Sequence, residues 1–118
     1  MAQQESLIID QGADYFVDFR FVNRNLGGYT ARMQFRKNID APTPLLSAST
    51  QDGRLQLSVE GADSRIMLHL PNSLTTAIEF KGEELEMVWG IELVSPTGLV
   101  ERPLYGTATL TKEVVRNG

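Results

Sequence analysis

The residues that most resemble catalytic machinery are a single histidine and the serines around it. His69 is the only histidine, and it stands between Leu68 and Leu70 in an alternating segment. Neighbouring residues of a strand point to opposite faces, so we expect His69 on the surface rather than beside a nucleophile. No serine lies in a Gly-x-Ser-x-Gly elbow. A hydrolase that uses His69 is therefore only a third alternative.

Paired carboxylates are the second arrangement that would do chemistry. Glu84, Glu86 and Glu92 share one face of a predicted strand, and the first two would lie about 7 Å apart. That separation suits acid and base roles. However, side chains that point away from a core are usually solvated, and no aromatic cleft accompanies these glutamates. We therefore predict no catalytic residues and no enzyme.

The acidic and glycine-rich segments do not match known ligand-binding loops. Asp10, Asp14 and Asp18 lack the spacing of an Asp-x-Asp-x-Asp-Gly calcium loop. Gly27 and Gly28 precede a predicted strand, whereas phosphate-binding glycines precede a helix. The chain has no cysteine, which excludes disulfides and thiolate metal sites. We expect neither a metal nor a cofactor.

The elements that must position these residues are almost all predicted strands. The clearest segment is residues 84–110, in which a turn at 95–98 joins two alternating arms and Trp89 lies on the apolar face. Further strands are predicted at 6–10, 14–22, 29–37, 45–50, 54–60 and 65–70, with one short helix at 71–77.

Seven or eight strands without helical crossovers predict an all-β fold, an antiparallel β-sandwich of the immunoglobulin-like type, with a closed barrel as the alternative. We expect residues 14–22 and 29–37 to form one hairpin. Asp52 and Gly53 predict a second hairpin between 45–50 and 54–60.

The length and charge of the chain limit its organisation and partners. At 118 residues we expect a single domain over 1–118, with flexible ends at about 1–5 and 111–118. The net charge of -4 argues against nucleic acid. No apolar run approaches a membrane span of about 20 residues. The N-terminus does not resemble a signal peptide, so we expect synthesis and folding in a cytoplasm.

Several residues are candidates for a partner interface. Phe16 interrupts the alternation of its strand, so either the same chain covers it or another subunit contacts it. Pro42 and Pro44 mark a crossing loop. The candidate interface residues are Phe16, Arg32, Arg36, Pro42, Pro44 and Tyr105.

Charge placement leaves two possibilities open. Basic residues gather in segment 20–37 and glutamates in segment 79–101. If these segments are neighbours, the charges form cross-strand pairs. If they lie on opposite flanks, the molecule is polarised and could dock head-to-tail with copies of itself.

Three parts of the chain resemble small β-sandwich virion proteins of tailed bacteriophages. The resemblance implies a non-enzymatic structural component that joins or decorates tail, baseplate, neck or capsid subunits. It also implies a multi-copy assembly with other virion proteins, and a virion location after synthesis in the host cytoplasm. The alternative is a carbohydrate- or host-receptor-binding module, which needs exposed aromatics such as Phe16, Tyr29 and Tyr105. The parts are residues 10–12 with 26–36, residues 53–55 with 66–71, and residues 89–93 with 96–98, 100–102, 106–110 and 113–116.

Overall fold

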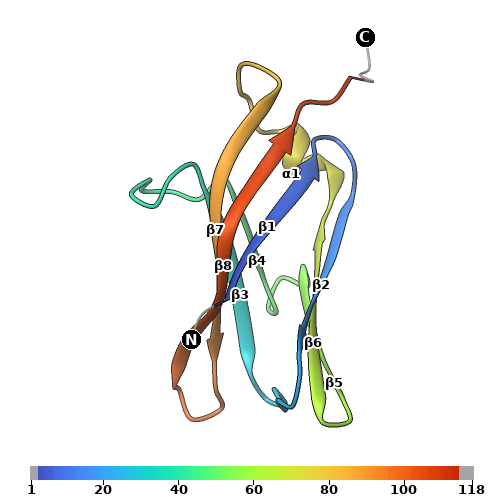
Figure 1. The fold of residues 1–118 in the computed structure, drawn as a ribbon, viewed down its shortest axis with the longest axis vertical. Helices are drawn as coiled ribbons and strands as arrows, with labels where there is room; N and C mark the ends of the chain where they lie inside the picture. The colour runs from blue at the N-terminus through green and yellow to red at the C-terminus, as the bar shows by residue number, and fades with distance from the viewer. Residues whose placement is uncertain (1–2, 115–118) are drawn as a thin grey trace.

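The computed structural model describes residues 3–114, which form two β-sheets packed face to face (Figure 1). The five-stranded sheet has the order β1-β8-β7-β3-β4, and the three-stranded sheet has the order β2-β6-β5. The strands are β1 (Gln3–Asp10), β2 (Tyr15–Phe21), β3 (Thr30–Arg36), β4 (Leu46–Ser49), β5 (Leu55–Glu60), β6 (Asp63–Leu70), β7 (Glu84–Val94) and β8 (Val100–Thr111).

The predicted immunoglobulin-like β-sandwich is confirmed. Eight strands and one short helix, α1 (Asn72–Thr76), match the expected content. The long hairpin is β7 with β8, and β5 pairs with β6 through a tight turn. None of the helices within residues 3–114 is long and apolar enough to cross a bilayer.

Two predicted hairpins are wrong. β2 pairs with β6, whereas β3 pairs with β4 and β7, so the chain changes sheets at residues 22–29. The chain changes sheets again at residues 50–54, because β4 pairs with β3 and β5 pairs with β6. Alternation determines which face of a strand is buried, but it does not identify the partner strand.

The first strand joins the last strand in parallel, which is the exception in a sandwich whose other pairs are antiparallel. The ladder runs from Gln3 opposite Leu104 to Asp10 opposite Thr111. Gly106 permits this close approach, because a side chain there would collide with the backbone of Glu5. β1 begins three residues before the predicted strand at 6–10. The predicted flexible ends at about 1–5 and 111–118 lie partly outside the described residues.

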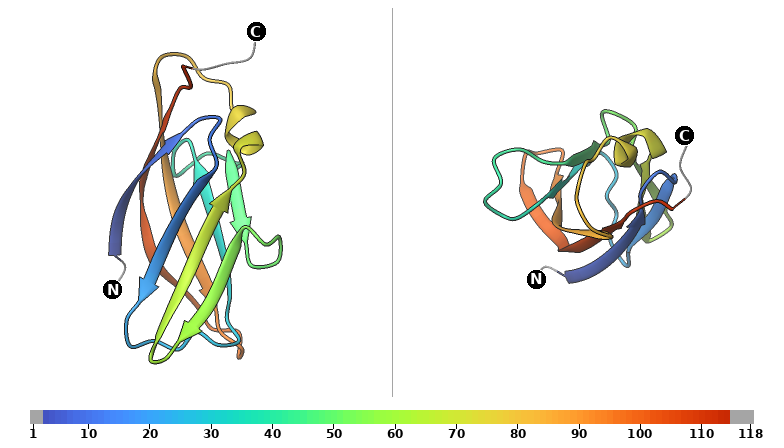
Figure 2. Two further views of the ribbon diagram at one scale, coloured as in Figure 1. Left: turned by 90° about the vertical axis from the view of Figure 1, so that its right-hand side faces the viewer. Right: turned by 90° about the horizontal axis from the view of Figure 1, so that it is seen from above.

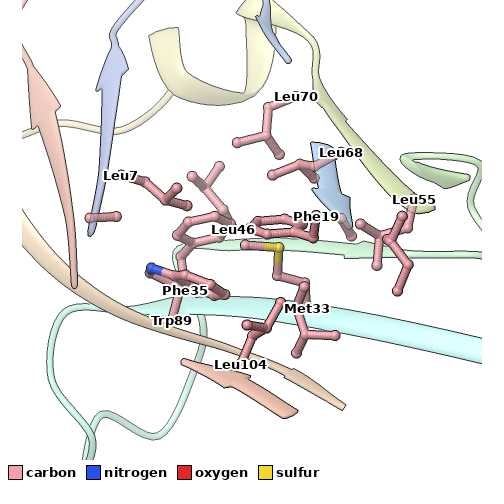
Figure 3. Close-up of a cluster of buried hydrophobic side chains, with 14 of the residues drawn as sticks. Leu7, Phe19, Met33, Phe35, Leu46, Leu55, Leu68, Leu70, Trp89 and Leu104 are labelled. Carbon is pink, nitrogen blue, oxygen red and sulfur yellow. The ribbon is translucent and has the colours of Figure 1, made fainter. Parts of the chain in front are cut away.

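The core lies between the inner faces of the two sheets (Figure 3). The apolar face of β7 forms its floor, as predicted, and the rings of Trp89 and Phe19 approach from opposite sheets with centroids 5.5 Å apart. The Trp89 indole N–H donates to the carbonyl of Thr107 at 3.0 Å. The core is thus a single layer that both sheets share.

A buried polar contact fastens α1 to the end of β1. Gln11 Nε2 donates to the carbonyl of Ile78 at 2.9 Å, and the backbone N–H of Gly12 donates to Thr75 Oγ1 at 3.0 Å. These bonds satisfy carbonyls and a hydroxyl that burial would otherwise leave without partners. The segment after α1 then crosses the upper end of the molecule to β7 (Figures 1 and 2).

Candidate functional site

The candidate site is a groove on the outer face of the five-stranded sheet. It has a volume of about 710 Å³ and is lined by side chains from β1, β3, β7 and β8. The loop between β3 and β4 projects sideways from the sandwich (Figures 1 and 2) and contributes Ile39 to the lining. We call this feature the outer-sheet groove. Its main lining residues are Arg32, Arg36, Ile39, Gly90, Arg102 and Tyr105.

Two arginines share one carboxylate in the groove. Arg32 lies opposite Glu92 in the register of β3 and β7 and approaches it at 3.0 Å. Arg102 of β8 approaches the other oxygen of Glu92 at 3.5 Å. Both guanidinium groups remain largely exposed, while Glu92 is mostly covered. The cluster therefore carries an excess positive charge that faces solvent.

Arg36 connects the groove to the neighbouring loop. Its Nη1 donates to the carbonyl of Ala41 at 2.7 Å, and its Nη2 donates to Gln34 Oε1 at 2.8 Å. These bonds hold the loop that carries Ile39, whose side chain is 83% exposed. No carboxylate of residues 3–114 forms an ion pair with Arg36. Together, the lining arginines and Glu92 give the groove a net charge of +2.

The middle of the groove is open because a glycine occupies it. Gly90 of β7 lies between Gln34 of β3 and Tyr105 of β8. A Cβ at Gly90 would meet only the carbonyl of Leu104, at 3.8 Å. The Tyr105 ring is 48% exposed and stands at the side of this opening. The site thus combines positive charge with an accessible apolar surface.

The structure brings together three of the six predicted interface residues. Arg32, Arg36 and Tyr105 line the outer-sheet groove, and Pro42 and Pro44 lie in the loop between β3 and β4. Whether a partner contacts them stays a prediction.

Phe16 lies apart from these residues, on the outer face of the three-stranded sheet. It is 61% exposed, and its ring stacks on His69 with centroids 4.3 Å apart. The first possibility for Phe16, that a loop or neighbouring element of the same chain covers it, is realised only on the face that stacks on His69. Tyr29 packs against the core. Among the three aromatic candidates for sugar binding, the groove contains Tyr105 alone.

The groups singled out for catalysis are dispersed. His69 Nε2 lies 3.6 Å from Asp14 Oδ1, on the opposite sheet from the glutamates. Glu86 accepts a hydrogen bond from Thr109 Oγ1 at 2.7 Å, and Glu92 is paired with arginines. In the part of the chain that the structure describes, no three His, Cys, Asp or Glu residues are placed to hold a metal ion.

The two possibilities for charge placement are each partly realised. Arg24 contacts Glu101 in a bidentate pair, with distances of 2.6 and 3.0 Å, and this pair lowers the pKa of Glu101. Arg32 and Glu92 form the second pair between the basic and acidic segments. In contrast, the segment 79–84, with Glu79, Glu83 and Glu84, joins α1 to the start of β7 at the upper end of the molecule (Figure 1).

Sequence reasoning missed Arg102, Ile39 and Gly90. Counting back from the turn at 95–98 would have placed Arg102 near Glu92, because the two arms of a hairpin face each other. The register shift between Ile91 and Leu93 would still have made that count uncertain by one residue. No signal in the sequence identified Ile39, because the path of its loop depends on Arg36.

The comparisons with known proteins return fimbrial subunits among the solved structures. One is AggA, the major subunit of aggregative adherence fimbriae type I from Escherichia coli, at 8% identity and a TM-score of 0.37, covering 92% of this chain and 89% of that chain. Another is the CooA pilin subunit from enterotoxigenic Escherichia coli, at 10% identity and a TM-score of 0.41, covering 96% and 92%. No family model and no curated protein matches the chain.

These findings correct the resemblance to tailed bacteriophages. The reported neighbours are bacterial fimbrial subunits rather than virion proteins. The expected family, the role in a tail, baseplate, neck or capsid and the virion location are therefore wrong. Virion partners are not supported. The cause is that the matched segments were mainly strand-and-turn patterns, which unrelated β-sandwiches share.

Proposed function

We propose that this chain is a non-enzymatic subunit of a multi-copy assembly and acts through protein–protein contacts. The observation that carries the proposal is the outer-sheet groove, which is open, positively charged and bordered by exposed apolar side chains. Interfaces favour arginine and aromatic residues in this combination. The groups with catalytic potential, in contrast, lie dispersed over both sheets.

Further support comes from β1, the strand at the edge of the same five-stranded sheet. Ile8 is 70% exposed and lies on the outer side of β1, an edge strand whose free side pairs with no strand among residues 3–114. Exposed edges and apolar side chains are surfaces that proteins usually cover by association.

Sedimentation velocity of the purified chain over a wide concentration range tests the proposal. We expect reversible species larger than the monomer, whose share grows with concentration. Chemical cross-linking in the same samples should trap the same species. A monomer at every concentration and salt condition would contradict the proposal.

A further inference from the structure

We propose that the outer-sheet groove binds the acidic tip of a second copy of this chain. The acidic tip is the segment 79–84, which follows α1, ends at the first residue of β7 and carries Glu79, Glu83 and Glu84. This inference rests on the proposed function and names the two surfaces that meet.

The acidic tip is exposed and negatively charged. The four residues from Lys81 to Glu84 are all exposed, as is Glu79. Lys81 is the tip's only basic residue, so the tip has a net charge of -2. Within residues 3–114, none of its three glutamates forms an ion pair.

The base of the tip is fixed by the end of β8. The backbone N–H of Lys112 donates to the carbonyl of Glu83 at 2.8 Å, and Lys112 Nζ donates to the carbonyl of Phe80 at 2.9 Å. The Phe80 ring packs against the core beneath this ammonium group. A segment that is ordered before binding loses less conformational entropy on association.

The groove complements the tip in charge and is open at its middle. Its net charge of +2 is opposite to that of the tip. The exposed guanidinium groups of Arg32 and Arg102 can each form forked hydrogen bonds with a carboxylate. Two residues along β7, Gly90 leaves open space between Gln34 and Tyr105 for an inserted loop.

The tip cannot reach the groove of its own chain. Glu84 and Gly90 both belong to β7, and six residues of strand separate them by about 20 Å. The contact must therefore join two copies. Because tip and groove are different surfaces, the contact is either exchanged reciprocally in a dimer or propagated along a series of copies.

The test uses charge reversal on each surface. The groove variant combines Arg32→Glu with Arg102→Glu, and the tip variant combines Glu83→Lys with Glu84→Lys. A third variant, Gly90→Trp, fills the groove without changing its charge, and aromatic residues suit strands. A control with the same change of charge, Arg20→Glu with Arg54→Glu, reverses one exposed and one half-buried arginine near the other sheet. Circular dichroism and urea unfolding establish that each variant is folded.

We expect the groove, tip and Gly90→Trp variants each to self-associate more weakly than the unaltered chain, by about tenfold or more. The control should associate normally. An equimolar mixture of the groove and tip variants should recover association, because each reversed surface then meets an opposite charge. Association of the unaltered chain should weaken between about 0.05 and 0.5 M salt.

Three results would overturn the inference. The first is self-association that persists unchanged in all three variants, which would leave the proposed function intact. The second is a mixture that does not recover association. The third is groove binding to heparin, a polyanionic glycan, that Gly90→Trp abolishes while the tip variant associates normally. If the unaltered chain never associates, the proposed function itself fails.

Discussion

At the scale of single residues, two glycines in neighbouring strands have opposite roles. Gly106 faces β1, where a methyl group would collide with the backbone of Glu5. Gly90 faces the groove, where the nearest atom to an added Cβ is 3.8 Å away. Glycine is therefore required by packing at Gly106, while at Gly90 it only keeps a surface open.

We predict that Gly106→Ala lowers the free energy of unfolding by about 2 kcal/mol, because the backbone of β1 must shift. Gly90→Ala should instead raise it by about 0.5 kcal/mol, since alanine restricts the unfolded chain. Urea unfolding measures both effects. If both substitutions changed the free energy of unfolding equally, β1 would not pack on Gly106 as described.

Asp63 links stability to pH. Its Oδ1 accepts the backbone N–H of Asn23 at 2.9 Å, and its Oδ2 accepts from Arg20 at 2.9 Å. The backbone bond first, and Arg20 second, lower the pKa of Asp63 below its ordinary value of 3.8. Ionised Asp63 therefore stabilises the fold above that ordinary value, and the contribution is lost as pH falls through the folded-state pKa.

We predict that Asp63→Asn flattens the acid limb of the stability curve. The difference between the unaltered chain and the variant should be largest near neutral pH and should shrink below about pH 4. Urea unfolding at a series of pH values measures this difference. Asp14 and Glu101, whose pKa values are also lowered, are the same in both proteins, so the difference reports on Asp63. A difference that is independent of pH would contradict the assignment.

At the scale of elements, only the inward-facing side chains of β1 are packed in the core. Ile9 is fully buried between the sheets, whereas Ile8 points outward from the same strand. We predict that Ile9→Ala lowers the free energy of unfolding by about 3 kcal/mol. The control Ile8→Ala should change it by less than about 0.5 kcal/mol. A similar loss at both positions in thermal or urea unfolding would show that Ile8 is also covered.

The elements themselves were largely predictable, but their partners were not. Alternation located the apolar face of β7 and the outward position of Phe16, because a strand repeats every two residues. It could not show that β2 leaves β3 for the other sheet, since either partner would bury the same face. The parallel position of β1 was equally invisible, because it joins residues about a hundred positions apart.

At the scale of the whole molecule, the candidate site exists only after the sheet is assembled. Arg36 and Tyr105 could be named from their types, but the groove needs β3, β7 and β8 side by side around Gly90. The acidic tip lies at the start of β7 and the groove lies further along the same strand, so the path of β7 sets the distance between them. Sequence reasoning therefore predicted several residues of the site but not its shape.

The parallel pairing of the terminal strands also determines how the molecule responds to force. Stretching the chain from the start of β1 and the end of β8 would slide these two strands past one another. Every interstrand hydrogen bond of their ladder would then bear the load at once, instead of opening in succession from one end. A sandwich connected in this way is mechanically tough along its length, whatever its equilibrium stability, because rupture is governed by the rate of unfolding.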